Sequence, residues 1–266
     1  MLKKILSNIM LLIWINPLAF ANAVERDRPV LLAIGELSFL TGLEYQQADY
    51  GTTDSTDLWR IPLGLGYRLN NFSLFASMPL LHAGSDGNII ATHKTSRTFM
   101  HSGRNSVSGI GDLTLSGTFY FTPQTRNTAS YHLTGGVKFG TADADKGLGT
   151  GEDDLFIEAG AYKNIDSYVL SAELGYEISG DAADFNYKNA LYGTAGLAKW
   201  TQNRGQLGGY LYFSEAQVSG LEEPLELNLF YTQFISKDHS VYYFISKGLS
   251  HGSPDYALGG NIQFYY

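Results

Sequence analysis

The side chains with the chemistry of a nucleophile and its base lie close together near the C-terminus, at His251 and Ser253. On a β-strand, alternate side chains share one face, so a His-x-Ser pair would place an imidazole beside a serine hydroxyl. Here Pro254 follows directly, the segment has the composition of a loop, and no carboxylate or amide is placed to orient the histidine. We therefore predict that the chain is not an enzyme, with lipid hydrolysis ranked third among three functional hypotheses.

Possible metal ligands occur in segments that have the composition of loops. The acidic segment 140–153 has some of the oxygen-ligand density of a calcium loop, but it lacks the ligand spacing of an EF-hand. Three histidines share another loop at irregular spacing, which favours surface positions over a metal centre. The sequence therefore predicts no metal site and no cofactor, and it leaves calcium binding by segment 140–153 open. The three histidines are His82, His93 and His101.

Ionisable side chains elsewhere alternate with apolar ones. In segment 58–69, Arg60 and Arg68 fall on the opposite parity from Trp59 and Leu65. An Arg or Lys on the lipid side of a membrane strand costs about 2–4 kcal/mol near the midplane, so charge confined to one parity indicates which face points inward. The residues that we predict to line the interior of a barrel are Arg60, Arg68, Asp112, Tyr120, Lys138, Glu158, Tyr162, Glu173, Glu177 and Glu226.

Two interpretations of these interior charges stay open. They could form a paired network that fills the space, or they could line a narrow watery path in which acids outnumber bases and anions are repelled. The interior aromatic side chains leave the same choice, between simple packing and a route for flat hydrophobic solutes. These aromatic candidates are Phe75, Tyr120, Phe156, Tyr162, Tyr242 and Phe244.

The elements that must position these residues are segments in which apolar and polar side chains alternate, the pattern of two-faced β-strands. Turn signals such as Asn70-Asn71 and glycine-rich stretches separate them. The facing of two segments, 188–200 and 206–215, stays unassigned because Gly and Ala occupy both parities. The predicted strands cover residues 36–46, 58–69, 72–81, 107–121, 131–139, 155–161, 167–179, 188–200, 206–215, 224–234, 241–245 and 255–266.

The connections between these strands alternate in length, as they do in outer-membrane barrels. Because backbone groups in hydrocarbon have no water to bond, every strand must pair on both sides, and the last strand must close on the first. The sequence therefore predicts an all-β fold, a transmembrane antiparallel up-and-down β-barrel of about twelve strands with both termini on the periplasmic side. The short connections are residues 70–71, 122–129, 163–166, 201–205 and 236–240.

The N-terminus has the pattern of a secretory signal peptide. Two lysines precede a mostly apolar stretch, and Ala-Asn-Ala at residues 21–23 is an A-x-A cleavage site. We predict cleavage between Ala23 and Val24, so that residues 1–23 are the signal peptide and residues 24–266 form the outer-membrane barrel domain. The expected location is the bacterial outer membrane.

The end of the chain is aromatic on its apolar face, at Phe264 and Tyr266. Assembly of outer-membrane barrels commonly uses such a strand, so we predict that these two residues are an insertion signal and that the barrel-assembly machinery is a partner. Outer-membrane lipid, lipopolysaccharide and a small-molecule solute are the other expected partners. The formal net charge of −8 argues against nucleic acid as a partner.

Three stretches of the chain resemble a known family. Residues 246–256 read SKGLSHGSPDY, residues 141–151 read TADADKGLGTG, and residues 108–115 read SGIGDLTL. In consistent order from about Gly35 to Tyr266, the chain resembles the outer-membrane transporters named for the meta pathway of phenol degradation. The resemblance implies a barrel of about twelve strands and uptake of phenol-like or other small hydrophobic compounds, and it supplies no established binding residues.

From residues and resemblance together we predict an outer-membrane channel or transporter for passive passage of small solutes, with hydrophobic or aromatic compounds as the expected cargo. The main alternative is a structural or surface-interaction barrel with a plugged lumen. The measurement that separates these two hypotheses is whether the purified protein conducts.

Overall fold

The structure is a computed structural model, and it describes residues 35–50, 55–85, 90–93, 96–99, 106–121, 128–180, 187–217 and 222–266. The predicted signal peptide and its cleavage site, Ala23 and Val24, lie outside these residues. Within the described ranges, no helix has the length and apolar character needed to cross a membrane.

Almost all regular structure in the described chain is β-strand, and one short 3-10 helix, η2 (Ala144–Lys146), follows β10. The strands in chain order are β1 (Glu36–Ala48), β2 (Thr56–Ile61), β3 (Leu63–Leu69), β4 (Phe72–Ser77), β5 (Leu80–Ser85), β6 (Ile90–His93), β7 (Ser96–Phe99), β8 (Ser106–Ile110), β9 (Leu113–Tyr120), β10 (Ser130–Phe139), β11 (Asp154–Ile165), β12 (Tyr168–Ile178), β13 (Ala190–Trp200), β14 (Gly205–Ser214), β15 (Leu225–Phe234), β16 (His239–Gly248) and β17 (Tyr256–Tyr265).

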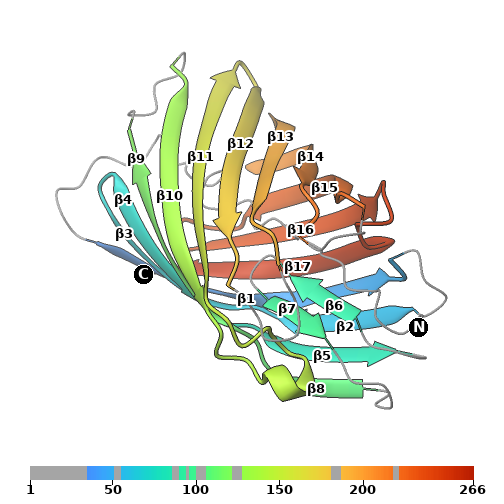
Figure 1. Cartoon of the computed structure of the whole chain (residues 1–266). Helices are drawn as coiled ribbons and strands as arrows, with labels where there is room; N and C mark the ends of the chain where they lie inside the picture. The colour runs from blue at the N-terminus through green and yellow to red at the C-terminus, as the bar shows by residue number, and fades with distance from the viewer. Residues whose placement is uncertain are drawn as a thin grey trace.

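The strands form one antiparallel sheet that closes on itself. Strand β17 pairs with β1, with Ser38 opposite Tyr265 and Gln47 opposite Tyr256, and Figure 1 shows the blue first strand beside the red last one. Three strands of the wall are each divided into two segments, β2 with β3, β4 with β5, and β8 with β9. Counted whole, the fifteen segments make a closed barrel of 12 strands. The predicted fold class is therefore confirmed.

The first division of a strand lies at Pro62. Strand β3 pairs with β1 with Thr41 opposite Leu63, and β2 continues the same register with Glu44 opposite Arg60. Proline has no N–H to donate, so it interrupts the ladder without shifting it. The predicted strand 58–69 is thus one strand with a break in its hydrogen bonding.

The division between β8 and β9 is different because the register shifts there. Ser77 lies opposite Thr114 and Leu80 lies opposite Ile110, so two residues on one strand face three on the other, Gly111 to Leu113. This is a β-bulge, which reverses the facing of the residues before it. The strand predicted over residues 107–121 is regular throughout and does not include this bulge.

Large apolar side chains on one parity are exposed on the outside of the barrel, and their neighbours are buried inside. On β12, Leu170 is exposed and Val169 is buried. The same sorting assigns β14, whose facing the sequence left open: Leu211 is exposed, whereas Tyr210 and Tyr212 are buried. The outer surface is therefore the apolar one, as a membrane-spanning barrel requires.

The two ends of the barrel differ in the length of their connections, as predicted. One end has tight turns such as that after β3, where Asn70 takes a left-handed conformation (φ 53°), and that after β11, where Asp166 does the same (φ 52°). The C-terminal residue Tyr266 lies at this end, bonded to Leu37. The other end has the longer connections, including residues 140–153.

The predicted loop that holds His82, His93 and His101 contains β-strand in its described part, and His101 lies outside the described residues. Strand β5 continues to Ser85, and residues 90–99 contain the separate hairpin β6–β7, with Ile90 opposite Phe99. Strands β6 and β7 form a two-stranded sheet that is not paired with the barrel sheet, and Figure 1 shows them as two short arrows near β2. This hairpin lies beside β2 on one side and beside η2 on the other.

Segment 140–153 folds against the inner face of the wall at the long-loop end. Leu148 is 1% exposed and packs in an apolar cluster with Leu58, Leu81 and Val107. A Cβ on Gly109 would lie 2.3 Å from the Leu148 side chain. Leu148 can therefore pack against β8 because residue 109 has no side chain. The segment therefore covers part of the barrel interior at that end.

The last residue contributes to closure through its backbone. The Tyr266 N–H donates to Leu37 O at 2.8 Å, and the Leu37 N–H donates to Tyr266 O at 3.3 Å. Deleting Tyr266 is expected to lower the amount of heat-resistant barrel in outer-membrane fractions, measured by gel mobility without boiling, because the last pair of closing backbone bonds and the terminal aromatic side chain of the outer parity are both lost. Tyr266→Phe keeps both and should assemble normally. Normal levels of the truncated protein would contradict this role.

Candidate functional site

The barrel interior holds an ion network where β8 ends and β10 meets the 140–153 segment. Lys138 Nζ lies 2.8 Å from Asp154 Oδ2 and 3.6 Å from Asp112 Oδ2, and all three side chains are almost fully buried. Asp112 also accepts the Ala142 N–H at 2.9 Å, and Asp154 accepts the Gly180 N–H at 2.8 Å. The network thus ties the bulge, β10 and two loop segments together.

A second ion pair joins the first strand to its neighbours on both sides. Arg60 on β2 donates to Glu44 on β1 at 3.0 Å, and Asn261 on β17 donates to the other oxygen of Glu44 at 2.9 Å. Both charged side chains are buried, each with only 5% of its side chain exposed. Arg68, further along β3, lies over the Tyr120 ring at 5.3 Å from its centroid, a cation–π geometry.

Three of the remaining predicted acids accept hydrogen bonds from neutral side chains. Glu177 accepts from Gln217 at 2.8 Å, and Glu226 accepts from Ser246 at 3.3 Å. Thr194 donates to Glu173 at 3.3 Å. The predicted interior residues are thus all buried or half-buried on the inner face. Their role as the lining of a path stays a prediction.

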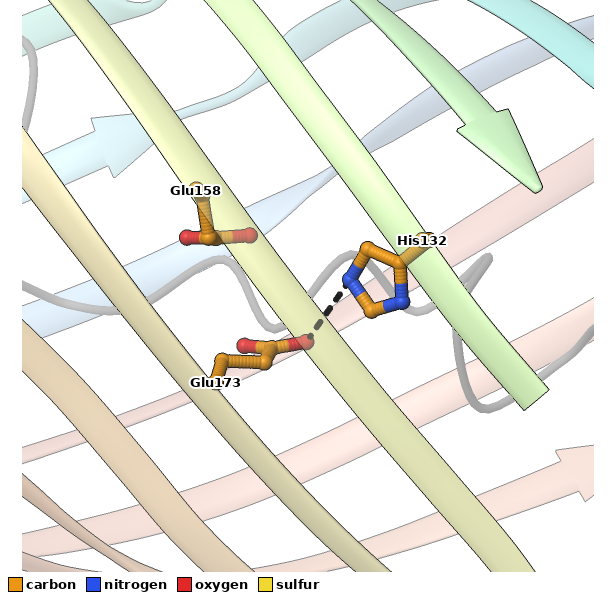
Figure 2. A group of neighbouring side chains, drawn as sticks. All are labelled: His132, Glu158 and Glu173. Atoms are coloured by element: carbon orange, nitrogen blue, oxygen red, sulfur yellow. Dashed lines mark ion pairs between the residues drawn. The ribbon is translucent and has the colours of Figure 1, made fainter. Parts of the chain in front are cut away.

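Two interior residues that matter were missed. Asp154 follows directly after the acidic segment 140–153 and was not predicted to lie inside the barrel, whereas the structure pairs it with Lys138 at the start of β11. His132 is 5% exposed and lies in a group with Glu158 and Glu173, in which the ligand atoms all fall within 4.8 Å of one another (Figure 2). His132 shares the parity of Lys138, and that signal alone would have placed it inside.

Aromatic side chains on the inner faces of β11, β13, β14, β15 and β16 belong to one buried apolar cluster, and we call them the aromatic wall. Phe230 stacks on Tyr242 with ring centroids 5.8 Å apart, and Tyr242 stacks on Phe244 at the same distance. The predicted Tyr162, Tyr242 and Phe244 belong to it. Four members were not predicted, three because their strands were unassigned. The wall comprises Tyr162, Tyr192, Tyr210, Tyr212, Phe230, Tyr242 and Phe244.

The acidic loop uses its oxygens internally. Asp143 caps η2 by accepting the Lys146 N–H at 3.1 Å and pairs with Lys146 Nζ at 2.8 Å. These bonds lower the pKa of the exposed Asp143 carboxyl. Asp153 accepts the Gly140 N–H at 2.9 Å. The loop oxygens that could serve calcium are therefore distributed among caps and ion pairs.

The His-x-Ser pair lies in the connection between β16 and β17, as expected from Pro254. Ser253 is 4% exposed, and its hydroxyl donates to Leu225 O at 3.0 Å and accepts the Leu225 N–H at 2.9 Å. His251 is exposed, and its backbone N–H is bonded to Glu222. The serine hydroxyl thus fixes a loop to the start of β15.

An antiparallel barrel with an apolar outside, a closed backbone ladder and a polar, aromatic interior defines the class of outer-membrane β-barrels. No family model matches the sequence, and no curated protein matches it. Comparison with solved structures identifies barrels of similar fold. The COG4313 outer membrane channel from Pseudomonas putida F1 superimposes with a TM-score of 0.61 at 14% identity, covering 90% of this chain and 97% of that one.

Two other barrels are similar at a lower level. The CymD monoaromatic hydrocarbon channel gives a TM-score of 0.46 at 9% identity, covering 87% of each chain. The transport unit of the autotransporter AIDA-I from Escherichia coli gives 0.49 at 12% identity, covering 94% of this chain and 98% of that one. Both scores are below 0.5. The comparison with the Pseudomonas channel establishes the fold.

Proposed function

We propose that this chain is an outer-membrane channel for the passive passage of small neutral solutes, hydrophobic or aromatic in character, and a member of the transporter family that its sequence resembles. The observation that carries the proposal is the aromatic wall inside the barrel. Rings stacked 5.8 Å apart, one pair between β15 and β16 and one pair along β16, present faces and edges on which a flat solute can move between equivalent contacts. The fold shared with a known channel supports the same conclusion.

The charges in the interior favour neutral solutes. Arg60 is paired with Glu44 and Lys138 with two aspartates, so the bases that could attract an anion are engaged. Glu173, Glu177 and Glu226 add acids to the same interior. An anion would meet this excess of carboxylates, whereas an uncharged aromatic solute would meet tyrosine rings and hydroxyls.

The proposal includes a location and an orientation. A cleaved signal peptide would export the chain, and the tight-turn end with Tyr266 would face the periplasm. Lipid would contact the exposed leucines and phenylalanines, and lipopolysaccharide would lie near the long-loop end. Delivery of the last strand to the barrel-assembly machinery, and a non-enzymatic role for the chain, belong to the same proposal.

A structural barrel with a plugged lumen is the second candidate, and a specific observation favours it. Asp112 and Glu226 are 0% exposed, and Leu148 fills space at the long-loop end. An interior packed this closely would need side chains to move before a solute could pass. Transport measurements therefore decide between the two candidates.

The test uses the purified full chain in liposomes and the rate at which they swell in nicotinamide or erythritol, two neutral solutes of similar mass of which only the first is aromatic. The channel should pass nicotinamide faster than erythritol. Phe230→Ala should reduce this preference by roughly two- to tenfold, because an aromatic contact contributes about 0.5–1.5 kcal/mol. The same change should raise single-channel conductance, since it removes volume from the interior.

Phe213→Ala is the matched control, because it removes the same ring from the neighbouring strand β14 on the exposed outer face. It should leave both the preference and the conductance unchanged. If wild-type liposomes swell no faster than protein-free ones in either solute, the channel proposal is wrong and the plugged barrel is favoured. A preference for nicotinamide that Phe230→Ala leaves intact would remove the aromatic wall from the mechanism.

A further inference from the structure

Three neighbouring strands bring His132, Glu158 and Glu173 together inside the barrel. His132 on β10 pairs with Gly160 on β11, and Gly160 pairs with Glu173 on β12. Glu158 stands two residues before Gly160 and on the same face of β11. Figure 2 shows the imidazole and both carboxyl groups directed toward one point on the inner surface.

The glycine between them makes the group possible. A Cβ at Gly160 would lie 2.4 Å from His132 Nε2 and 3.0 Å from Glu173 Cγ, closer than side chains pack. With only hydrogen at this position, the imidazole lies across β11 and reaches the carboxyl group of the strand beyond. The three-strand arrangement therefore depends on residue 160 having no side chain.

The histidine is a polar side chain that the protein has buried without satisfying it. Its Nδ1 has no hydrogen-bond partner among the described residues, and its side chain is only 4% exposed. Its Nε2 faces Glu173 Oε1 at 3.6 Å, which is longer than a hydrogen bond. Buried polar groups in native proteins are usually bonded. Nε2 is the nitrogen that faces the carboxyl groups, and among the described residues it makes no polar contact closer than this one, so Nε2 is the nitrogen available to a ligand.

We propose that His132, Glu158 and Glu173 bind one divalent first-row transition-metal ion, with Zn²⁺ as the best match. One imidazole and two carboxylates are ligands that zinc accepts at bonds of about 2.0–2.2 Å, with a further position left for water. Such bonds place ligand atoms roughly 3.4 Å apart in a tetrahedral site. The His132–Glu173 distance of 3.6 Å already meets this, and because all the ligand atoms lie within 4.8 Å of one another, side-chain adjustment can close the remaining separations.

The choice of a transition metal follows from the imidazole. Calcium and magnesium prefer sites made of oxygen, whereas a nitrogen ligand favours zinc, copper, nickel and iron. A protonated His132 in an ion pair with Glu173 is the competing explanation of the same geometry. Metal binding distinguishes the two explanations, because the ion pair forms without any added metal.

The first experiment is calorimetric titration of ZnCl₂ into the full-length barrel, purified without a histidine tag and stripped with a chelator. We expect one saturable site per chain at pH 7.5. Glu173→Gln should weaken it at least tenfold, because it replaces a charged ligand with a poor one. Glu177→Gln is the matched control, since it removes the same charge from the same face of β12 and should change the affinity less than threefold.

Gly160→Ala provides an independent variant in which all three ligands remain. It should weaken zinc binding at least tenfold because its methyl group would occupy the position of the imidazole. Gel mobility without boiling verifies that each variant is folded. Equal affinity in the wild type, Glu173→Gln and Gly160→Ala would show an adventitious ion only, and no saturable site in the wild type would overturn the proposal and leave the ion pair.

A spectroscopic measurement can first be made on the wild-type protein alone, and variants then assign the signal. Cu²⁺ added at one equivalent should give an electron paramagnetic resonance spectrum with the coupling of a single imidazole nitrogen. His132→Asn should abolish this coupling, whereas His239→Asn, at the tight-turn end, should keep it. Coupling that survives in His132→Asn, or coordination without nitrogen in the wild type, would refute the assignment.

Discussion

Lys138→Met is expected to destabilise the folded barrel by about 3–5 kcal/mol, the usual cost of removing one partner from a buried ion pair. Lys138 is 1% exposed and lies between Asp112 and Asp154, so its removal leaves two carboxylates buried without their cation. The measurement is urea unfolding of the barrel in detergent, followed by the fluorescence of Trp59 and Trp200.

Lys146→Met is the matched control because Lys146 also pairs with an aspartate at 2.8 Å, but both side chains are more than 40% exposed. Exposed pairs contribute about 0–1 kcal/mol, so this variant should unfold almost as the wild type does. Replacing Asp112 and Asp154 with asparagine in the Lys138→Met background should recover part of the loss. Equal destabilisation by the two lysine variants would show that the network is not a stabilising one.

The position of Lys138 explains why we expect the stability of the barrel to depend on it. Strand β10 pairs with β9 as far as Phe139 opposite Leu113, whereas β8 pairs with β5 and is joined to β10 by no ladder in the described chain. The lysine and its two aspartates lie where the ladder ends. They hold the bulge and the 140–153 segment against the wall by side-chain contacts instead.

Leu174→Arg is expected to destabilise the barrel in lipid vesicles by about 2–4 kcal/mol, because Leu174 is 52% exposed near the middle of β12 and the arginine would face hydrocarbon. The loss in the free energy of unfolding thus tests whether this face of β12 points toward the lipid. Urea titration of the vesicle-inserted protein, with folded and unfolded forms separated by gel mobility, gives the free energy of unfolding.

Ile178→Arg provides the comparison at a different depth. Ile178 is the last residue of β12, on the same outer face and 49% exposed, so an arginine there reaches the membrane surface and should cost about 0–1 kcal/mol. Equal effects at the two positions would mean that depth in the membrane does not set the cost. A tolerated Leu174→Arg would contradict the outward facing of this parity.

Much of the fold could be predicted from the sequence because a two-faced strand is a local property. Trp59 and Leu65 on one parity, with Arg60 and Arg68 on the other, indicate a strand and its facing without knowledge of any partner. Connection lengths then separate the two ends of the barrel. Where both parities hold small residues, as in β13 and β14, the local signal is missing, and the inward facing of Tyr210 and Tyr212 became clear only from pairing.

The candidate site was predictable only in part. The burial of Lys138 and Glu173 follows from their parity, but the partner of each depends on strand register, which sequence alternation does not contain. His132 reaches Glu173 only because Gly160 stands opposite both, and a shift of one residue would move that glycine to the outer face. The bulge at Gly111 to Leu113 likewise arises from a mismatch between two strands.

The sequence by itself therefore determined the class of fold, the approximate number of strands, the facing of most of them and the apolar outer surface, because the two-residue period within each segment carries these signals. Only the tertiary structure decided which interior residues meet: Lys138 with its two aspartates, the aromatic wall, and the group of His132, Glu158 and Glu173. These contacts join strands through register, and register is set by the pairing of the whole closed sheet.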